Sequence, residues 1–268
     1  MLMTAFTDGK TLRQAAREGA FSAPTSGQAM DFVQANLVVV PRDAAYDFLL
    51  FCQRNPKPCP LLEVVDAGSV EARRLAPGSD LSRDLPRYRI FRDGKFAEER
   101  TDVSDLWRDD FVSFLIGCSF SFDRRLIDAG LEVRNVSLGK NVSMYRTNIP
   151  TRKAGRFEGP LVVSMRPFKP DRAVRASVVT SELPQVHGAP IHLGNPAALG
   201  ISDLSKPEYG DPVPVHEGEL PVFWACGVTP QEVLLRARLP IAITHAPGHM
   251  FVSDLREDEL KEFSEQVA

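Results

Sequence analysis

Short apolar runs alternate with helical patterns along much of the chain. Leu37–Val40 has the length and β-branched content of a strand, and Pro41 then stands where a first helical turn tolerates proline. Apolar residues continue on one helical face up to Asn55, and Leu61–Val65 returns to a strand pattern. This part of the chain therefore predicts a strand, a helix and a second strand.

The same patterns predict further elements along the chain. Asp93-Gly94 supplies the positive φ angles that a two-residue turn needs, so the flanking segments predict a hairpin. Ser104 can cap a helix that ends near Gly117. Other helices are expected at Thr11–Ala20, Gln28–Gln34, Phe122–Ala129, Arg172–Ser181, Thr229–Arg238 and Arg256–Ala268. Other strands are expected at Leu161–Met165, Val222–Ala225 and Ile241–Thr244.

This alternation indicates an α/β protein of the mixed α+β class, with a mixed sheet, flanking helices and long irregular functional loops. A chain of 268 residues can bury one large core, so we expect a single domain over residues 1–268. Two closely packed subdomains, about 1–130 and 131–268, are the alternative. The longest irregular segment is Pro184–Pro214, and connections of this length in a domain are usually functional.

Composition narrows the class of protein. A net charge of -3 gives no strong attraction to nucleic acid or to an anionic membrane. No stretch approaches the roughly 20 apolar residues of a membrane helix, and residues 1–10 lack the pattern of a signal peptide. Four dispersed cysteines without a Cys-x-x-Cys pair are typical of reduced thiols. We therefore expect a cytoplasmic protein without nucleic-acid or membrane partners, and a homo-oligomer stays open.

The segment Gly117–Asp123 is the first candidate for chemistry. A helix that begins here offers unpaired backbone N–H groups and a positive dipole end, which attract a carboxylate or phosphate. Ser119 and Ser121 can add hydroxyl groups, and Cys118 beside a helix N-terminus could be a nucleophile. The alternative is that Ser121 only caps the helix and Cys118 only packs.

A second group of candidates is polar and rich in arginine. Tyr145, Arg146 and Asn148 stand close together, and Arg166 follows the next predicted strand. Guanidinium groups hold carboxylates through paired hydrogen bonds, so these residues are candidates for substrate binding. A solvated or ion-paired role is the alternative for any single arginine.

Four of the five histidines are candidates for proton transfer, because imidazole titrates near neutrality. They are His187, His192, His245 and His249. The last two have the spacing of a helical metal-binding pair, but a proline and a glycine between them oppose a helix. We expect no cofactor, while a divalent metal stays open. A role in packing is the alternative for each histidine.

Nine strings in the chain resemble the signature segments of a hydro-lyase family related to D-glutamate cyclase. They are Val33–Leu37, Cys59–Glu63, Asp84–Tyr88, Ile116–Phe122, Met144–Pro150, Gly155–Pro167, Val186–Pro190, Pro221–Pro230 and Ile243–Phe251. The resemblance covers about residues 25–255. It implies a carbon–oxygen lyase of amino-acid metabolism that reversibly removes water from D-glutamate to give 5-oxo-D-proline.

Ring closure of glutamate needs a neutral amine, an electrophilic carboxyl group and a hydroxyl group that leaves as water. A bare carboxylate is a poor electrophile, which weakens a covalent role for Cys118. We therefore expect the α-carboxylate on Arg146 or Arg166, the reacting carboxyl group at the Gly117–Asp123 segment, and proton transfer by the histidines. Action on another small carboxylate, as a hydro-lyase or a lactam hydrolase, and carboxylate binding without turnover stay open.

Overall fold

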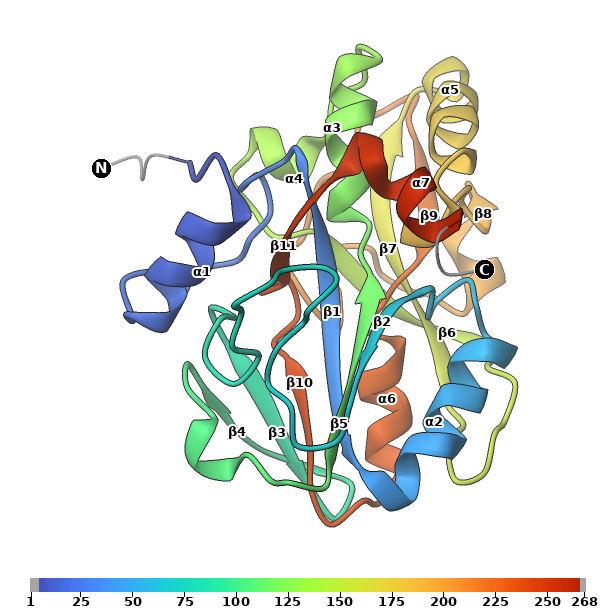
Figure 1. Cartoon of the computed structure of the whole chain (residues 1–268). Coiled ribbons are helices and arrows are strands. Elements are labelled where there is room, and N and C mark those ends of the chain that lie inside the picture. The colour runs from blue at the N-terminus through green and yellow to red at the C-terminus, as the bar shows by residue number, and fades with distance from the viewer. Residues whose placement is uncertain (1–4, 266–268) are drawn as a thin grey trace.

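Two β-sheets carry the fold, with helices packed between and around them (Figure 1). The computed structural model describes residues 5–265, and side chains within its last helix up to residue 263. The large sheet has the order β2-β5-β1-β10-β3-β4, and β11 also pairs with β1. Its strands are β1 (Phe32–Pro41), β2 (Leu61–Val65), β3 (Tyr88–Arg92), β4 (Lys95–Arg100), β5 (Phe111–Gly117), β10 (Ala242–His245) and β11 (Phe251–Arg256). The small sheet has the order β6-β7-β9-β8, with β6 (Ser143–Pro150), β7 (Pro160–Phe168), β8 (His192–Leu193) and β9 (Leu220–Ala225).

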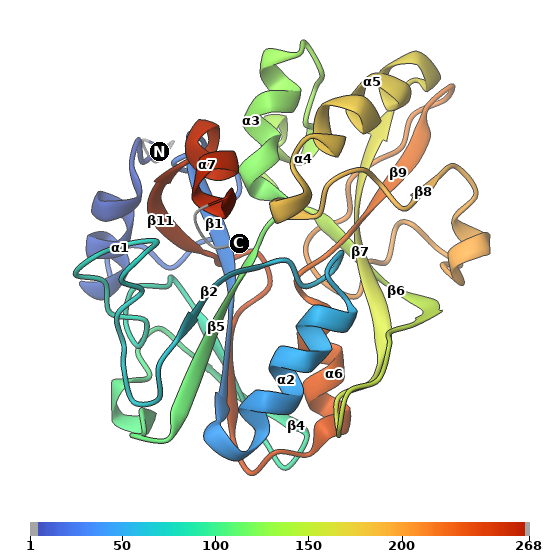
Figure 2. The ribbon, with the colours of Figure 1, turned by 45° about the vertical axis from the view of Figure 1, so that its right-hand side comes forward.

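Helices fill the space between the two sheets. Figure 2 shows α2 (Arg42–Arg54) and α6 (Thr229–Ala237) side by side in this space, where Phe48 of α2 packs against aromatic rings on both sides. Helices α3 and α5 lie together at one end of the molecule (Figure 2). The remaining helices and short 3-10 segments are α1 (Gly9–Arg17), α3 (Phe120–Asp128), α4 (Arg134–Ser137), α5 (Pro170–Ser181), α7 (Leu260–Glu265), η1 (Ser104–Leu106), η2 (Pro184–Val186), η3 (Pro196–Leu199) and η4 (Glu257–Glu259).

Strand β1 organises the large sheet, because it pairs with β5, β10 and β11. Successive side chains of a strand point to opposite faces. Leu37 and Val39 therefore face one apolar cluster, whereas Val38 and Val40 face the cluster that contains α2 and α6. Both faces are buried, which explains why β1 reads as a nearly continuous apolar run.

The structure confirms the mixed α+β class, and every pairing between described strands is antiparallel. Most predicted elements lie close to their expected bounds, including the Asp93-Gly94 hairpin between β3 and β4. The end of the predicted C-terminal helix, residues 266–268, lies outside the described residues. In the described part of the chain, no helix is both long and apolar enough to span a bilayer.

Two predicted helices are wrong. The segment predicted as a helix from Ser104 to Gly117 is the short η1 followed by strand β5. Phe111, Phe114 and Leu115 have helical spacing, but β5 is buried on both faces, so its apolar residues carry no strand periodicity. Residues 28–31 form turns and residues 32–34 already belong to β1, where the Gln34 side chain donates to the backbone carbonyl groups of Thr25 and Gln28.

Candidate functional site

Two strand-to-helix turns meet at one place in the fold. The first turn, Gly117–Ser119, joins β5 to α3, and the second turn, Cys226–Val228, joins β9 to α6. Asn36 of β1 connects them, because its Nδ2 donates to the Gly117 carbonyl at 2.8 Å and its side chain lies against Gly227. The predicted candidate segment therefore begins at the end of a strand and not at the end of a helix.

Glycine is required in both turns because of close contacts. A Cβ atom at Gly117 would lie 2.0 Å from the carbonyl oxygen of Gln185, in the segment before His187. A Cβ atom at Gly227 would lie 2.0 Å from Asn36 Nδ2. Side chains at these positions would push apart the segments that meet here. The two glycines thus allow η2, β1 and both turns to converge.

Each turn contains a backbone N–H group, directly after its cysteine, for which the described residues provide no acceptor. The amides of Cys118 and Cys226 donate to carbonyl groups of neighbouring strands, at 3.1 and 3.0 Å. Within the described residues, no acceptor is found for the N–H groups of Ser119 and Gly227, which follow these cysteines. Since both groups precede the first turn of a helix, they suit an anion. Unpaired N–H groups at a helix N-terminus attract a carboxylate or an oxyanion.

A buried ion pair lies directly behind the first turn. Arg166 of β7 is 0% exposed, and its Nη2 lies 2.8 Å from Oδ1 of Asp123 on α3. The same nitrogen donates to the hydroxyl oxygen of Ser119 at 3.2 Å. The guanidinium group also lies against the rings of Phe122 and Trp224, at 5.0 and 5.6 Å from their centroids. Arg166 therefore orients Ser119 and has no face open to solvent.

Burial changes the acidity of the groups in this turn. It raises the pKa of Asp123 to about 6, although the guanidinium of Arg166 opposes this shift. Neither carboxylate oxygen makes a well-aligned hydrogen bond, so Asp123 can hold a proton close to neutral pH. Burial also raises the pKa of the Cys118 thiol far above its ordinary range and that of Cys226 to about 11. Both thiols therefore stay protonated near neutral pH, which disfavours a nucleophilic Cys118.

Ser121 holds the first turn to the large sheet. Its hydroxyl oxygen accepts from the backbone N–H of Gln34 at 2.9 Å, and the side chain is fully buried. The Ser121 hydroxyl group is therefore already used in a contact within the protein. Ser119, in contrast, lies at the N-terminus of α3 beside Arg166. Of the two predicted serines, Ser119 is the better placed to meet a ligand.

His187 belongs to the segment that packs against the first turn. It adopts a left-handed backbone conformation with a φ angle of 82°, and its Nδ1 lies 2.9 Å from the carbonyl oxygen of Lys57. A carbonyl group only accepts, so Nδ1 carries the proton and Nε2 keeps its lone pair. Burial, together with the charges of Lys57 and Arg166, lowers the pKa of His187 to about 4. At neutral pH this imidazole is an uncharged base.

The other three predicted histidines lie in β10, in β8 and in the loop between β10 and β11. His245 is level with Leu37 in the register of β10 and β1, and its Nδ1 donates to the Leu37 carbonyl at 3.3 Å. Alternation along β1 places Leu37 and Asn36 on opposite faces of the sheet. His249 donates through Nδ1 to the Pro247 carbonyl, and His192 of β8 donates through Nε2 to the Asn195 carbonyl. Burial lowers the pKa of His245 to about 3.

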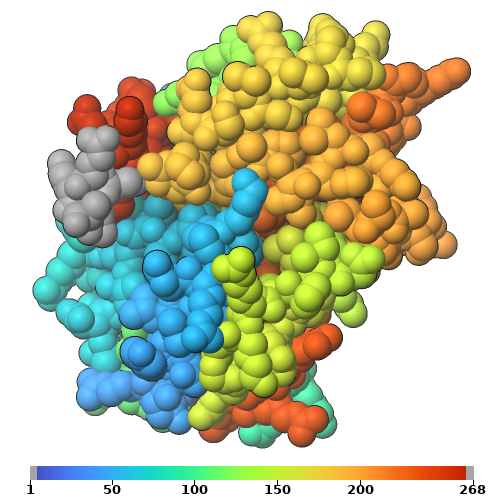
Figure 3. Space-filling model, turned by 90° about the vertical axis from the view of Figure 1, so that its right-hand side faces the viewer, coloured from blue at the N-terminus to red at the C-terminus, as the bar shows by residue number. Residues whose placement is uncertain are grey.

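The predicted carboxylate-binding residues of β6 point in two directions. The Tyr145 hydroxyl group is directed inward and donates to the Leu204 carbonyl at 2.7 Å. Arg146 points outward, is half exposed, and pairs with Glu232 of α6 at 3.3 Å. Asn148 is exposed and lies against Gly200. Figure 3 shows the face on which the segments near residues 50, 150 and 190 come together. Arg146 thus has a partly accessible guanidinium group. Met144 of the same strand packs in one apolar cluster with Cys118 and Cys226 of the two turns.

Sequence reasoning did not single out Asn36 or the pairing of Asp123 with Arg166. These residues are far apart in the chain and carry no local signature of their own. One signal was present, because a buried strand followed by cysteine, a small residue and a helix start occurs at both Cys118 and Cys226. In the described part of the chain, no group of three or more His, Cys, Asp or Glu side chains is arranged to hold a metal ion.

Comparison with known proteins shows similarity to one family over most of the chain. The family model described as D-glutamate cyclase matches residues 112–254. A protein of Stutzerimonas stutzeri (strain A1501) named "Putative hydro-lyase" is 56% identical over 262 residues, which cover 97% of this chain and 99% of that protein. "Putative hydro-lyase YcsI" of Bacillus subtilis (strain 168) is 55% identical over 251 residues, covering 94% of this chain and 98% of that protein. The range matched by the family model contains both turns, Arg166 and His187.

Proposed function

The chain belongs to the D-glutamate cyclase family, and we propose that it is a hydro-lyase that reversibly converts D-glutamate to 5-oxo-D-proline and water. The observation that carries this proposal is the pair of free N–H groups at Ser119 and Gly227, beside the buried ion pair of Arg166 and Asp123. Cyclisation of glutamate passes through a tetrahedral oxyanion, and preorganised N–H donors stabilise such a species.

The first turn would hold the reacting side-chain carboxyl group of glutamate. Its developing oxyanion accepts hydrogen bonds from the backbone amides of Ser119 and Gly227. One such donor contributes roughly 10²–10³ in rate in enzymes of this kind. The Ser119 hydroxyl group, whose oxygen already accepts from Arg166, can donate a hydrogen bond to the oxygen that leaves as water and so orient it. Arg166 acts here as a positioning residue.

His187 would act as the base. As the C–N bond forms, the attacking nitrogen loses a proton, and Nε2 of His187 has the free lone pair to accept it. The pKa of about 4 keeps this nitrogen unprotonated at neutral pH. The protonated imidazole then passes this proton to the hydroxyl oxygen that leaves as water, so His187 returns to its neutral form. In the reverse direction the same nitrogen removes a proton from the water that opens the lactam and passes it to the lactam nitrogen. The α-carboxylate is assigned to Arg146, which is the accessible one of the two predicted arginines.

Substrate NMR with purified protein tests the reaction directly. D-glutamate, L-glutamate and the two 5-oxoprolines are incubated separately, with and without a chelator. Interconversion of the D pair is the expected result, and the absence of any interconversion of this pair contradicts the proposal. Turnover of another small carboxylate would keep the hydro-lyase class but change the substrate, and saturable binding without product would indicate a carboxylate-binding protein.

A matched pair of histidine variants tests the assigned base. His187→Gln should lower kcat by about 10²–10⁴, the usual contribution of a general base. His216→Gln is the control, because His216 is exposed in a turn of the irregular segment before β9. Equal turnover of the two variants would remove His187 from the mechanism while leaving the overall reaction intact.

A further inference from the structure

Arg146, to which the α-carboxylate is assigned, has one carboxylate partner within the described residues. Its side chain is half exposed, and its Nε lies 3.3 Å from Oε1 of Glu232. In the same part of the chain, no hydrogen bond is found from either terminal nitrogen of its guanidinium group. A guanidinium group carries N–H donors on both terminal nitrogens as well as on Nε. The terminal nitrogens of Arg146 are therefore open to a second carboxylate, which they can hold through paired hydrogen bonds.

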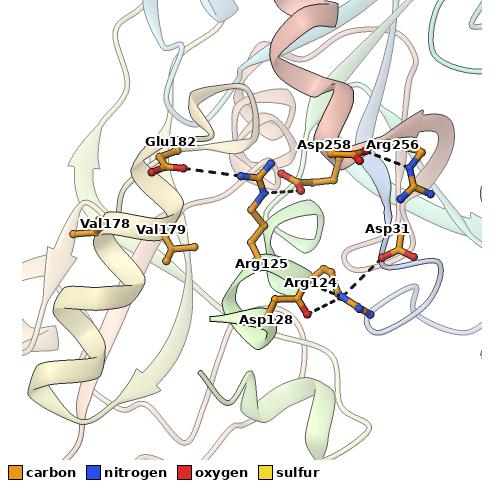
Figure 4. Close-up of a pocket in the computed structure, with 10 residues that line it drawn as sticks. Asp31, Arg124, Arg125, Asp128, Val178, Val179, Glu182, Arg256 and Asp258 are labelled. Carbon is orange, nitrogen blue, oxygen red and sulfur yellow. Dashed lines mark hydrogen bonds and ion pairs between the residues drawn. The ribbon is translucent and has the colours of Figure 1, made fainter. Parts of the chain in front are cut away.

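Arg124 on α3 shows the opposite arrangement. Its Nε lies 3.1 Å from Asp128 and 3.9 Å from Asp31, so two carboxylates flank one guanidinium group (Figure 4). A carboxylate from outside the chain would meet two negative charges at Arg124 but only one at Arg146. Of these two surface arginines, Arg146 is the one suited to bind an anion.

Glu232, the partner of Arg146, is itself held in place. The residue is 5% exposed, and its Oε1 accepts from the Tyr209 hydroxyl group at 2.6 Å. The same oxygen faces Arg146. Burial and the neighbouring charge of Glu232 raise the pKa of Tyr209 well above its ordinary value, so the hydroxyl group stays a donor at neutral pH. A buried carboxylate with two such partners has little freedom, and it fixes the direction of the Arg146 side chain.

Tyr209 connects this ion pair to the two turns. Its backbone pairs with Met144 of β6, donating at 3.2 Å and accepting at 2.9 Å. Its ring packs against the apolar cluster that contains Cys118 and Cys226. One side chain thus joins the cluster formed at the two turns to the carboxylate that holds Arg146.

We propose that Glu232 and Tyr209 are positioning residues for Arg146, and that the fixed guanidinium group selects substrates with a carboxylate on the carbon that carries the amine. An arginine that is already oriented loses less conformational entropy when it binds a carboxylate. Because it concerns the α-carboxylate of the same substrate, this selection rests on the proposed function. The substrate class is that of amino dicarboxylates, and 4-aminobutanoate, which lacks the α-carboxylate, lies outside it.

Titration calorimetry with glutarate and butanoate tests the selection on the full chain. Neither compound has an amine, so neither can form a lactam during the measurement. The two differ in one carboxylate, and the wild type should bind glutarate at least about tenfold more tightly than butanoate. Equal affinity for the two compounds, or no binding of glutarate, overturns the proposal.

Variants of the two positioning residues should weaken glutarate binding and leave butanoate binding unchanged. We expect about tenfold weaker binding of glutarate in Glu232→Gln and about threefold in Tyr209→Phe, which removes only the hydroxyl group. For D-glutamate, KM should rise by similar factors with kcat within about threefold of the wild type, because the α-carboxylate does not react. Loss of a nearby negative charge alone would favour an anion. Tighter or unchanged glutarate binding in both variants therefore overturns the positioning role.

Glu208→Gln is the matched control. Glu208 accepts from the backbone N–H of Arg146 at 3.1 Å, so this variant also removes a negative charge near Arg146 but leaves the pair with Glu232 in place. Glutarate binding should not weaken in it. In an Arg146→Met background, Glu232→Gln should have no further effect on glutarate binding, since Glu232 acts through the arginine. Additive losses in that double variant contradict the positioning role.

Failure of this selection can be told apart from failure of the proposed reaction. Interconversion of D-glutamate and 5-oxo-D-proline by a wild type without a preference for glutarate would keep the reaction and overturn the selection. A preference for glutarate that is lost in Glu232→Gln, without interconversion of the D pair, would contradict the reaction and support the selection.

Discussion

The two strand-to-helix turns have the same local plan but different surroundings. In each, a buried strand ends at a cysteine whose amide is tied to a neighbouring strand, and the next N–H group is free. The first turn has a buried ion pair behind it, formed by Arg166 and Asp123. The second turn is backed by neutral groups, because the Thr229 hydroxyl group bonds to the carbonyl of Cys226 and to Val162. The same backbone motif thus supplies a charged environment in one turn and a neutral one in the other.

This difference indicates which part of the proposed reaction each turn supports. A helix N-terminus alone gives a modest attraction for an anion. Arg166 adds a fixed charge next to Ser119, so proton transfer and charge stabilisation are assigned to the first turn. Gly227 adds one neutral donor from the second turn. Substitutions at corresponding residues of the two turns should therefore have unequal effects.

Removal of the buried cation should have the largest effect on stability. Arg166→Met leaves Asp123 buried without its partner and should lower the free energy of unfolding by about 3–5 kcal/mol at pH 7. The loss should be smaller at pH 5, where Asp123 can be protonated. Thr229→Val in the second turn removes neutral hydrogen bonds and should cost about 1 kcal/mol. Urea unfolding measures both, and equal losses would contradict the division between the turns.

The second-largest expected difference between the turns is the pH dependence of the free energy of unfolding. Asp123 has a pKa of about 6 in the folded chain, above its ordinary value of 3.8. Between these two values the unfolded chain loses this proton while the folded chain retains it, so the contribution of Asp123 to stability falls as the pH rises. With about 1.4 kcal/mol for each pKa unit, the fall is roughly 2–3 kcal/mol.

Asp123→Asn isolates this contribution, because asparagine does not titrate. The difference in unfolding free energy between wild type and variant should change between pH 4 and pH 6 and be constant above. His187 titrates with the opposite sign in a similar range, since its folded pKa of about 4 is lowered, but it is common to both proteins and cancels. Thr229→Val should keep the slope of the wild type. A wild-type slope in Asp123→Asn would show that this carboxyl group does not titrate here.

Substitution of the two turn glycines by alanine should lower the free energy of unfolding by different amounts. Gly117→Ala meets the backbone carbonyl of Gln185, which is hard to move, and should cost about 2–3 kcal/mol. Gly227→Ala meets only the side chain of Asn36 and should cost about 1 kcal/mol. In an Asn36→Ala background the second cost should largely disappear, since the obstacle is gone. Additive losses in that double variant would contradict the contact between Asn36 and Gly227.

The smallest expected effect concerns the two cysteines. Alkylation with iodoacetamide should be slow for both thiols at pH 8, because burial keeps them protonated. As the pH rises towards 11, Cys226 should react before Cys118, and peptide mass mapping measures the order. Cys118→Ala should retain turnover within about threefold of the wild type. Abolished turnover in this variant would restore the nucleophilic role that the structure disfavours.

Much of the local structure could be predicted from the sequence, and the failures have a physical reason. Helices α2, α5 and α6 each begin within one residue of a proline, and the Asp93-Gly94 pair predicted its hairpin. Strand β5 was assigned to a helix because a strand buried on both faces loses its twofold pattern. Strands β6 and β11 were not predicted.

For the candidate site, the sequence alone determined which segments carry reactive groups. The turn at Gly117, the arginines and the histidines were all identified from residue type and spacing. Only the tertiary structure decided their partners: Arg166 with Asp123, His187 with Lys57, and Gly227 with Asn36. These contacts join positions that are tens to hundreds of residues apart, and burial then sets the charge of each group. Acidity and partnership depend on the surrounding dielectric and on neighbouring charges, which no local pattern in a single chain records.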